Sequence, residues 1–216
     1  MKKFFLIGND ISKSLSPKIH SIIYREYDID AKYELYQIQD IKEAIKLFNI
    51  ADGLNITAPF KDKITKYLKH NFAQINSVNT MIVHNLSGYS TDGLGFMLDA
   101  KRLGLNIKRV YIIGSGGAAI SIMHELSKIE SEIFIHDRKH DVFDTIKKIN
   151  PSLVINATPV KFGLDKVYDL KYNDYEGISG IGMLIYQAIL SSELFLGTKI
   201  NLSIFSKILR CIQNEN

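Results

Sequence analysis

The 216-residue sequence predicts an α/β fold with two lobes, and three observations support this prediction. Short apolar runs of strand length alternate with segments whose apolar residues recur at helical spacing. That alternation is typical of parallel βα units, with helices on both faces of a sheet. A glycine-rich turn in the second half starts a new series of strands, and the length allows one to two domains at about 150 residues each. We expect residues 1–92 and 183–216 to form one domain and residues 93–182 the other.

The first half contains four expected strands and two expected helices. The strands are residues 4–7, 31–38, 54–57 and 78–83, and a turn is expected at residues 85–88. Ser16 and Pro17 are typical of an N-cap and a first helical residue, and the apolar residues that follow at helical spacing are Ile19, Ile22, Ile23 and Tyr27. Asp40 and Glu43 form a capping box. It predicts a second helix whose buried face carries Ile41, Ala44, Ile45 and Phe48.

The second half repeats the alternation. A helix is expected at residues 93–103, ending at Gly104. Strands are expected at residues 110–113, 133–135 and 153–155, with an apolar helix after the first of them. The last third is expected to be helical at residues 182–196 and 200–212.

Composition and charge argue against several classes of protein. Hydrophobic residues make up 46% of the chain and charged residues 23%, which is ordinary for a globular protein and excludes a disordered one. The apolar runs are too short to span a bilayer and no signal peptide is readable, so we expect a cytoplasmic protein without a membrane partner. The net charge is +4, but 22 of the 27 basic residues are lysines spread along the chain, which argues against a nucleic-acid partner.

Cysteine and histidine usage predicts no metal. Cys211 is the single cysteine, which excludes an internal disulfide and a cysteine-based zinc site. His136 and His140 are four residues apart, but they follow a strand end in a basic loop, where we expect them to be solvated. The composition is compatible with a monomer or a homodimer.

A glycine-rich motif follows the expected strand at residues 110–113. Residues 114–119 read Gly-Ser-Gly-Gly-Ala-Ala and fit the pattern G-x-G-x-x-A between a strand and a helix. The first glycine permits a tight turn, the second lets the backbone approach a pyrophosphate, and the helix N-terminus offers N–H groups to the phosphates. The candidate cofactor-binding residues are Gly114, Ser115, Gly116, Gly117 and Ala118. A tight βα turn that binds no ligand is the alternative interpretation.

The end of the next strand should select the dinucleotide. Asp137 can accept hydrogen bonds from the ribose hydroxyls, which favours NAD. Arg138 and Lys139 can hold a 2′-phosphate, which favours NADP. The residues themselves leave both cofactors open.

Polar clusters in the first half stand where strands end. They contain the hydroxyls of Ser14, Ser16 and Thr57, the amides of Asn55 and Asn79, the ammonium of Lys61 and the carboxylate of Asp92. A polyol or hydroxy-acid substrate needs such a mixture of short neutral hydrogen-bonding groups with one charge pair. Taken singly, each cluster is also compatible with turn and capping chemistry.

Together these motifs resemble the shikimate dehydrogenase family, in order and over nearly the whole chain. The matching segments are residues 8–17, 55–61, 77–80, 91–93, the glycine motif from Gly114, residues 156–159 and residues 180–188. The resemblance implies an N-terminal substrate-binding domain, here residues 1–92 and 183–216, and a Rossmann-like dinucleotide-binding domain, here residues 93–182. It also implies NADPH-dependent, reversible reduction of 3-dehydroshikimate to shikimate, a step of chorismate and aromatic amino-acid biosynthesis.

The resemblance also implies roles for individual residues. Ser14 and Ser16 correspond to residues that bind the substrate carboxylate. The residues that correspond to the rest of the substrate pocket are Asn55, Thr57, Asn79, Asp92, Tyr172 and Gln187. Thr158, Leu170 and Gly180 correspond to positions on the cofactor side.

Lys61 corresponds to the catalytic residue of the family, and the chemistry agrees with that role. Reduction of a ketone by hydride leaves a developing alkoxide that needs a proton donor. A lysine can serve in a pocket of low polarity, while a neighbouring carboxylate, here Asp92, orients the ammonium and raises its pKa again. Without the resemblance, a structural Lys61–Asp92 ion pair would be the preferred interpretation.

The sequence departs from the family pattern at three places. Ser90 stands where the family has asparagine before Thr-Asp-Gly, and Asp137 adds a carboxylate to the motif that selects NADP. The connection between Tyr172 and Gly180 is shorter than usual, which predicts impaired hydride transfer. Two alternatives follow, an NAD-preferring quinate/shikimate dehydrogenase and a catalytically impaired module that binds shikimate-type ligands or a nucleotide. The presence of both Lys61 and Asp92 argues against the second.

Overall fold

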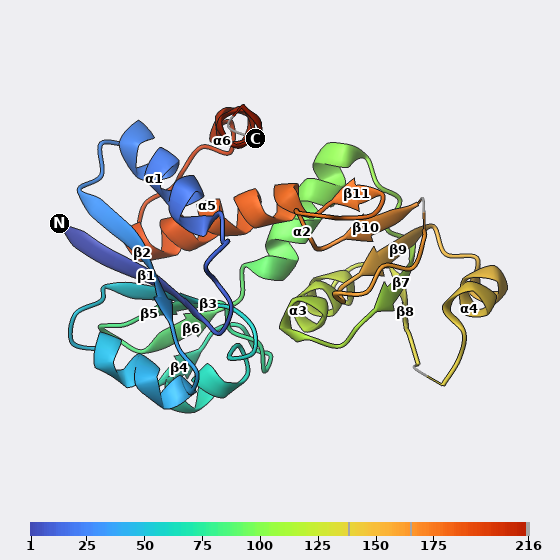
Figure 1. Ribbon diagram of the computed structural model, residues 1–216, viewed down its shortest axis with the longest axis horizontal. Coiled ribbons are helices and arrows are strands. Elements are labelled where there is room, and N and C mark those ends of the chain that lie inside the picture. The colour runs from blue at the N-terminus through green and yellow to red at the C-terminus, as the bar shows by residue number, and fades with distance from the viewer. Residues whose placement is uncertain (138, 165, 215–216) are drawn as a thin grey trace. The chain divides into compact units, whose positions relative to one another are not determined.

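The computed structural model describes residues 1–137, 139–164 and 166–214. It confirms the predicted α/β class and divides the chain into two compact units (Figure 1). Unit 1 comprises Met1–Thr91 and Ile185–Asn216, and unit 2 comprises Asp92–Leu184. The chain therefore passes between the units twice, between residues 91 and 92 and between residues 184 and 185.

Unit 1 contains a six-stranded sheet and the C-terminal helices. Its elements are β1 (Lys2–Gly8), α1 (Ser16–Glu26), β2 (Ala31–Gln37), the 3₁₀ helix η1 (Ile41–Leu47), β3 (Gly53–Ile56), the 3₁₀ helix η2 (Lys63–Tyr67), β4 (His70–Asn71), β5 (Thr80–Ile82), β6 (Ser87–Tyr89), most of α5 (Ile181–Leu196), and α6 (Ile204–Gln213). Helix α6 begins four residues later than predicted, after a turn at residues 202–203.

The sheet of unit 1 is mixed, whereas the alternating pattern predicted a parallel one. Its strand order is β2-β1-β3-β5-β6-β4; β1 is parallel to β2 and β3, but β5 is antiparallel to both β3 and β6. The predicted turn at residues 85–88 lies at residues 83–86 instead, and Ser87–Tyr89 form a strand. A connection this short can join only antiparallel neighbours, because a parallel pair needs a long crossover.

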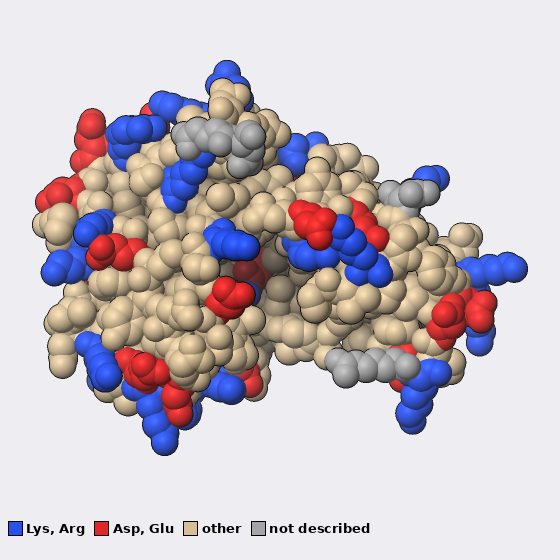
Figure 2. All heavy atoms as spheres, in the orientation of Figure 1, with Lys and Arg blue, Asp and Glu red and all other residues tan. Residues whose placement is uncertain are grey.

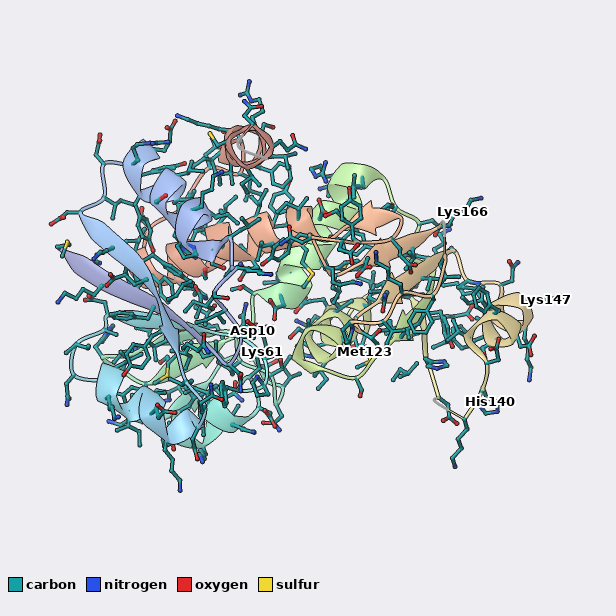
Figure 3. The ribbon with its side chains drawn as sticks, viewed as in Figure 1. Asp10, Lys61, Met123, His140, Lys147 and Lys166 are labelled. Carbon is teal, nitrogen blue, oxygen red and sulfur yellow. The ribbon has the colours of Figure 1, made fainter. Side chains whose placement is uncertain are left out.

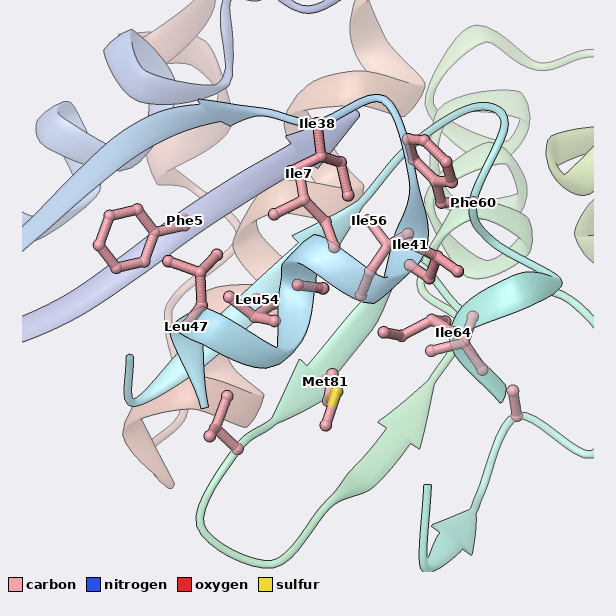
Figure 4. Close-up of a cluster of buried hydrophobic side chains, with 14 residues drawn as sticks. Phe5, Ile7, Ile38, Ile41, Leu47, Leu54, Ile56, Phe60, Ile64 and Met81 are labelled. Atoms are coloured by element: carbon pink, nitrogen blue, oxygen red, sulfur yellow. The ribbon is translucent and has the colours of Figure 1, made fainter. Parts of the chain in front are cut away.

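Strand β1 is buried on both faces of this sheet. Phe5 and Ile7 pack with η1 and η2 in the cluster of Figure 4. Phe4 points to the opposite face, where its ring stacks on Phe195 of α5 at a centroid distance of 4.6 Å. Burial on both faces explains why residues 4–7 form a continuous apolar run rather than an alternating one.

Two local expectations in unit 1 were wrong. The capping box of Asp40 and Glu43 is present, but the helix that it starts is a 3₁₀ helix. Three residues per turn align Ile41, Ala44 and Leu47 on the buried face and leave Ile45 46% exposed, which the predicted α-helical spacing had placed inside.

Ser16 is not the N-cap of α1. The cap position is Leu15, and the helix begins at Ser16 with Pro17 in its first turn. Pro17 is therefore the second helical residue rather than the first, and it still lies in the first turn, where proline is tolerated.

Unit 2 contains a five-stranded, fully parallel sheet. Its elements are α2 (Asp92–Leu103), β7 (Arg109–Ile113), α3 (Gly117–Leu126), β8 (Glu132–Ile135), α4 (Val142–Ile149), β9 (Leu153–Asn156), β10 (Val167–Asp169), β11 (Ile178–Ser179) and the start of α5. The strand order is β11-β10-β9-β7-β8. The chain order reverses between β7 and β9, and in sheets of this type ligands bind at that point, outside the carboxyl ends of the strands.

Helices cover both faces of the unit 2 sheet. Helices α2 and α3 pack on one face, with Phe96, Ile122 and Ile155 fully buried. Helix α4 packs on the other face against Tyr111 and Val154. Among the described residues, no helix combines the length and the apolar composition that crossing a bilayer requires.

Candidate active site

The loops that follow β1 and β3 lie against each other at the carboxyl ends of these strands. The Thr57 amide donates to the Ile7 carbonyl at 2.9 Å, and the Asn9 amide donates to the Ala58 carbonyl at 3.4 Å. A glycine is required at position 8, because a Cβ atom there would lie 2.5 Å from the Thr57 methyl group. The close approach places Thr57 beside the loop that leads into α1.

Lys61, labelled in Figure 3, lies in the loop between β3 and η2. Phe60 is 1% exposed, and its amide donates to the Thr57 carbonyl at 3.0 Å. The Lys61 carbonyl accepts from the Val78 amide at 2.9 Å. The half-buried Lys61 is therefore joined through its backbone to the segment that carries Asn79.

Asn79 links three segments of unit 1. Its Nδ2 donates to Thr91 Oγ1 at 2.9 Å and to Gln187 Oε1 at 3.3 Å, and its Oδ1 accepts from the Thr91 amide at 2.8 Å. Thr91 Oγ1 also donates to the Gln187 carbonyl at 3.2 Å. All three residues are less than 10% exposed. The network holds α5 against the segments before β5 and after β6.

Asn55 on β3 is tied into the same part of the unit. Its Nδ2 donates to the Asn79 carbonyl at 3.0 Å and to Thr80 Oγ1 at 3.1 Å. Its Oδ1 accepts from the Tyr33 hydroxyl at 2.7 Å. The amide is 4% exposed and has one orientation that satisfies these bonds.

Ser14 and Ser16 meet at the start of α1. Ser14 Oγ donates to Ser16 Oγ at 3.2 Å, and the Ser16 amide donates to Ser14 Oγ at 3.2 Å. Their hydroxyls therefore stand at a helix N-terminus, where the partial positive charge of the backbone favours an anion.

Two residues of this region were not predicted from the sequence, Tyr33 and His20. Tyr33 of β2 stacks on the His20 ring with a centroid distance of 3.9 Å and an interplanar angle of 8°. His20 Nδ1 is hydrogen-bonded to Ser192 Oγ at 2.9 Å, and Tyr24 contacts the same nitrogen at 3.2 Å. Burial lowers the pKa of His20 to about 3, which the nearby Asn55 side chain only partly offsets. The sequence could have indicated both residues, because a polar ring on an otherwise apolar, buried face needs a hydrogen-bond partner.

Unit 1 thus brings together most of the residues predicted to bind substrate. They are Ser14, Ser16, Asn55, Thr57, Lys61, Asn79 and Gln187. Asp92 and Tyr172 belong to unit 2. Asp92 is the buried first residue of α2 and follows Thr91 directly, and Tyr172 lies half-buried between β10 and β11.

The glycine motif of unit 2 has the local geometry of a dinucleotide loop. Gly114 follows β7 directly and has φ at +114°, and a Cβ atom there would lie 3.0 Å from both the Ala157 carbonyl oxygen and the Thr158 methyl group. Gly116 has open space where a Cβ atom would stand. Helix α3 begins at Gly117, and its cap residue Gly116 has no side chain, so a ligand can approach the backbone closely there. These residues fit a pyrophosphate.

The carboxyl end of β9 faces this loop. Asn156 Oδ1 accepts from Thr158 Oγ1 at 2.8 Å and from the Thr158 amide at 3.0 Å, which fixes the turn after the strand. Leu170 is joined to the same strand end, since its amide donates to the Asn156 carbonyl at 3.0 Å. A Cβ atom on Gly180 would lie 2.6 Å from the Leu170 carbonyl oxygen, so the backbone of these two residues is in close contact.

Asp137 and Lys139, two of the residues expected to select the cofactor, are exposed and follow β8. Asp137 Oδ1 accepts from the Lys139 amide at 3.0 Å, and its other oxygen lies 3.4 Å from His140 Nδ1. Arg138 lies outside the described residues. His136 is not solvated as predicted but half-buried, with Nδ1 hydrogen-bonded to the Tyr111 hydroxyl at 2.5 Å. Within the described ranges, no group of histidine, cysteine and acidic side chains could hold a metal ion.

The short connection between β10 and β11 is tied to the loop after β9. The Glu176 carboxylate accepts from the amides of Phe162 and Gly163, each at 2.8 Å. Lys161 and Asp174 form an exposed ion pair. The hydrogen bonds from the backbone lower the pKa of Glu176, so it remains a carboxylate at neutral pH. The short connection between β10 and β11 is therefore held by contacts with the loop after β9.

Comparisons with known proteins point to one family. The model of the shikimate dehydrogenase substrate binding domain matches residues 6–81. A shikimate dehydrogenase (NADP(+)) of Pyrococcus abyssi is 32% identical over 247 aligned residues, which cover 91% of this chain and 93% of that protein. This alignment is longer than the chain itself, so the relative contains insertions that this chain lacks.

Solved structures agree with the sequence relatives. Shikimate dehydrogenase 1 from Peptoclostridium difficile superposes with a TM-score of 0.85 at 27% identity, covering 100% of this chain and 99% of that chain. A shikimate dehydrogenase in complex with NADP⁺ superposes with a TM-score of 0.78 at 26% identity, covering 96% of this chain and 94% of that chain.

Proposed function

Because this chain belongs to the shikimate dehydrogenase family, we propose that it catalyses the NADP-dependent, reversible reduction of 3-dehydroshikimate to shikimate in chorismate biosynthesis. The observation that carries the proposal is the group of hydrogen-bonding side chains and one lysine at the carboxyl ends of β1 and β3. In this proposal unit 1 binds the substrate and unit 2 binds the dinucleotide. The proposal includes a cytoplasmic location. It also includes no nucleic-acid partner, since acidic and basic side chains are interspersed on the face shown in Figure 2.

The substrate roles follow from the chemistry of each group. Ser14 and Ser16 donate hydrogen bonds to the substrate carboxylate at the N-terminus of α1. Thr57, Asn79 and Gln187 contact the ring hydroxyls, for which neutral donors and acceptors are suited. Asn55 stands behind them on β3. Tyr172 is the remaining residue that we propose to bind the substrate.

Lys61 transfers the proton. As the ketone becomes an alcohol, the Lys61 ammonium donates a proton to the developing alkoxide, and in the reverse direction the neutral amine removes it. Asp92 is the second residue that we assign to this proton transfer. Acid–base help of this kind contributes about 10²- to 10⁴-fold to the rate.

The residues of unit 2 hold the cofactor, which when bound supplies the hydride. Gly114, Ser115, Gly116, Gly117 and Ala118 surround the pyrophosphate at the start of α3. Arg138 and Lys139 hold the 2′-phosphate of NADP. Thr158, Leu170 and Gly180 position the end of the cofactor that reacts. Asp137 is the observation that favours NAD as a second cofactor, because its carboxylate can accept from the ribose hydroxyls.

The test follows the reduction of NADP⁺ by its absorbance, with shikimate as the substrate. The same assay is run with NAD⁺ in place of NADP⁺ and with quinate in place of shikimate. Lys61→Ala should abolish turnover while shikimate still binds, and Lys69→Ala, an exposed lysine near η2, should leave turnover unchanged. Faster turnover with NAD⁺ would show that Asp137 outweighs the basic residues. Binding of shikimate without turnover on either cofactor would replace the proposal by a binding module.

A further inference from the structure

Asp169 is a fully buried carboxylate at the end of β10, and the proposed function gives it no role. Its side chain is 0% exposed, and the residue pairs in register with Asn156 at the end of β9. A charged side chain in the interior costs free energy unless its oxygens accept hydrogen bonds. The groups that bond to Asp169 therefore indicate which part of the chain it holds in place.

Both oxygens of Asp169 bind the backbone of the short connection between β10 and β11. Oδ1 accepts from the Lys171 amide at 3.0 Å, and Oδ2 accepts from the Glu176 amide at 3.1 Å. The Lys171 ammonium lies 3.6 Å from Oδ2 and donates to the Pro159 carbonyl at 3.3 Å. One buried side chain thus fixes the connection near its start and near its end.

The connection starts at Leu170 and leads to Gly180, the two residues to which we assigned the reacting end of the cofactor. The Gly180 amide donates to the Lys171 carbonyl at 2.9 Å. A Cβ atom on Gly180 would lie 2.6 Å from the Leu170 carbonyl oxygen and 2.8 Å from the Asp169 carbonyl oxygen. The backbone is packed here without room for a side chain. A displacement of Lys171 is therefore passed directly to Leu170 and Gly180.

This packed backbone lies at the carboxyl edge of the unit 2 sheet. Ligands of doubly wound sheets bind outside the carboxyl ends of the strands. Strand β9 ends beside β10 at this edge, and the turn that follows β9 contacts the first glycine of the cofactor loop, since a Cβ atom on Gly114 would lie 3.0 Å from the Ala157 carbonyl oxygen. The residues that Asp169 holds thus belong to the same edge as the glycine motif.

We propose that Asp169 is a positioning residue for hydride transfer, acting through the backbone of Leu170 and Gly180. This inference rests on the proposed function. With its start and its end bonded to Asp169, the short connection holds the reacting end of the cofactor without a longer segment, and hydride transfer is not impaired. Fixed geometry matters at this point, because a displacement of about 1 Å can cost about 100-fold in rate.

The first test is Asp169→Asn, which keeps the size of the side chain but turns one acceptor oxygen into an N–H donor that faces a backbone N–H. We expect kcat for shikimate oxidation to fall by about 10- to 100-fold, with the KM for shikimate within about twofold. Asp174→Asn is the matched control, because it makes the same change in the same connection on a side chain that is 83% exposed. It should keep kcat within about twofold.

Two further measurements separate positioning from a general loss of structure. 2′-Phospho-ADP-ribose is NADP⁺ without its nicotinamide, and by calorimetry it should bind Asp169→Asn within about twofold of the wild type. Shikimate deuterated at the carbon that gives up the hydride should show a larger isotope effect on kcat in Asp169→Asn, because hydride transfer then limits the rate. A preparation that merely contains less folded protein would have a lower kcat with an unchanged isotope effect.

Three outcomes overturn the inference. They are a kcat of Asp169→Asn that matches the wild type, an isotope effect that does not increase, and a loss of 2′-phospho-ADP-ribose affinity as large as the loss of kcat. If Asp169→Asn does not fold, the same comparison is made between Lys171→Met and the double variant Asp169→Asn/Lys171→Met. The double variant removes both charges of the pair, so neither is left without its partner. Equal kcat values for these two variants also overturn the inference.

The wild-type measurement distinguishes this inference from the proposed function on which it rests. If the wild type turns over shikimate with neither cofactor, the proposed function is wrong and this inference falls with it. If the wild type is active and Asp169→Asn matches it in kcat and in isotope effect, only the inference is wrong.

Discussion

The two units hold their candidate ligand-binding groups in opposite ways. In unit 1 the groups are side chains that are buried and bonded to one another, as for Asn55, Asn79 and Gln187. In unit 2 they are backbone atoms of a glycine loop and side chains of an exposed loop, where Asp137 is 55% exposed.

This difference follows from the ligands that the two units are proposed to bind. A small polyol acid offers few contacts, so its site needs donors and acceptors that are fixed in advance. A dinucleotide offers phosphates, which backbone N–H groups at a helix start can bind without a particular side chain. Substitutions in unit 1 should therefore disturb folding and substrate affinity together, whereas those in unit 2 should separate the two.

The largest expected effect is a loss of stability at low pH, caused by the buried His20 of unit 1. Its folded pKa of about 3 lies below the ordinary value of 6.5, so the unfolded state takes up the proton first. Its contribution to stability is fully present above pH 6.5 and is lost as the pH falls toward 3. The loss is about 1.4 kcal/mol per pH unit and on the order of 5 kcal/mol in all.

Denaturant unfolding at several pH values checks this expectation against His20→Asn. The free-energy difference between wild type and His20→Asn should shrink as the pH falls below 6.5. His140→Asn, an exposed histidine of unit 2, is the control and should show no such trend. If the free-energy difference between wild type and His20→Asn stays constant with pH, the lowered pKa of His20 is contradicted.

The next effect is expected at Asn79, the centre of the unit 1 network. Asn79→Ala leaves the Thr91 amide and the Gln187 side chain without their partner, at a cost of roughly 3 kcal/mol. Thermal unfolding and the KM for shikimate should both change. Asn71→Ala removes an exposed amide that bonds only its own loop and should cost less than about 1 kcal/mol. Equal costs for the two variants would mean that burial of the network adds nothing.

The glycine loop of unit 2 should separate stability from affinity. Gly114→Ala forces a side chain into a backbone at φ +114° and should cost roughly 1–3 kcal/mol in stability, along with NADP⁺ affinity. Gly116→Ala places its Cβ atom in open space, so it should fold normally and weaken only NADP⁺ binding. Calorimetric titration with NADP⁺ and a melting curve for each variant provide the comparison. Loss of stability in Gly116→Ala would disprove the interpretation of the loop.

The smallest effect is expected at Glu176, in the short connection of unit 2. Glu176→Gln removes the charge and leaves one acceptor oxygen where the carboxylate has two, so only one of the Phe162 and Gly163 amides keeps its bond. The KM for NADP⁺ should rise only about twofold. The KM for shikimate should stay the same. A large fall in kcat would show that this carboxylate has a role in hydride transfer that its position does not suggest.

The sequence by itself determined the class of the fold and the position of most elements. Apolar runs of strand length and helical periodicity depend on neighbouring residues alone, so β7 and α2 were predicted within one residue. The capping box at Asp40 and the left-handed Gly104 after α2 are equally local. The family motifs also identified Ser14, Lys61 and Gln187 as candidate site residues, although their roles remain proposals.

Only the tertiary structure decided the rest, because it depends on contacts between distant residues. The antiparallel pairing of β5 with β3 and the packing of η1 against β1 and β3 both join segments that are distant in sequence. Tyr33 bonds Asn55 across 22 positions of sequence, and Asn79 bonds Gln187 across 108. No local pattern contains such pairs. A buried polar side chain satisfies its hydrogen bonds wherever the fold brings a partner, and that partner is defined only once the sheet and helices have packed.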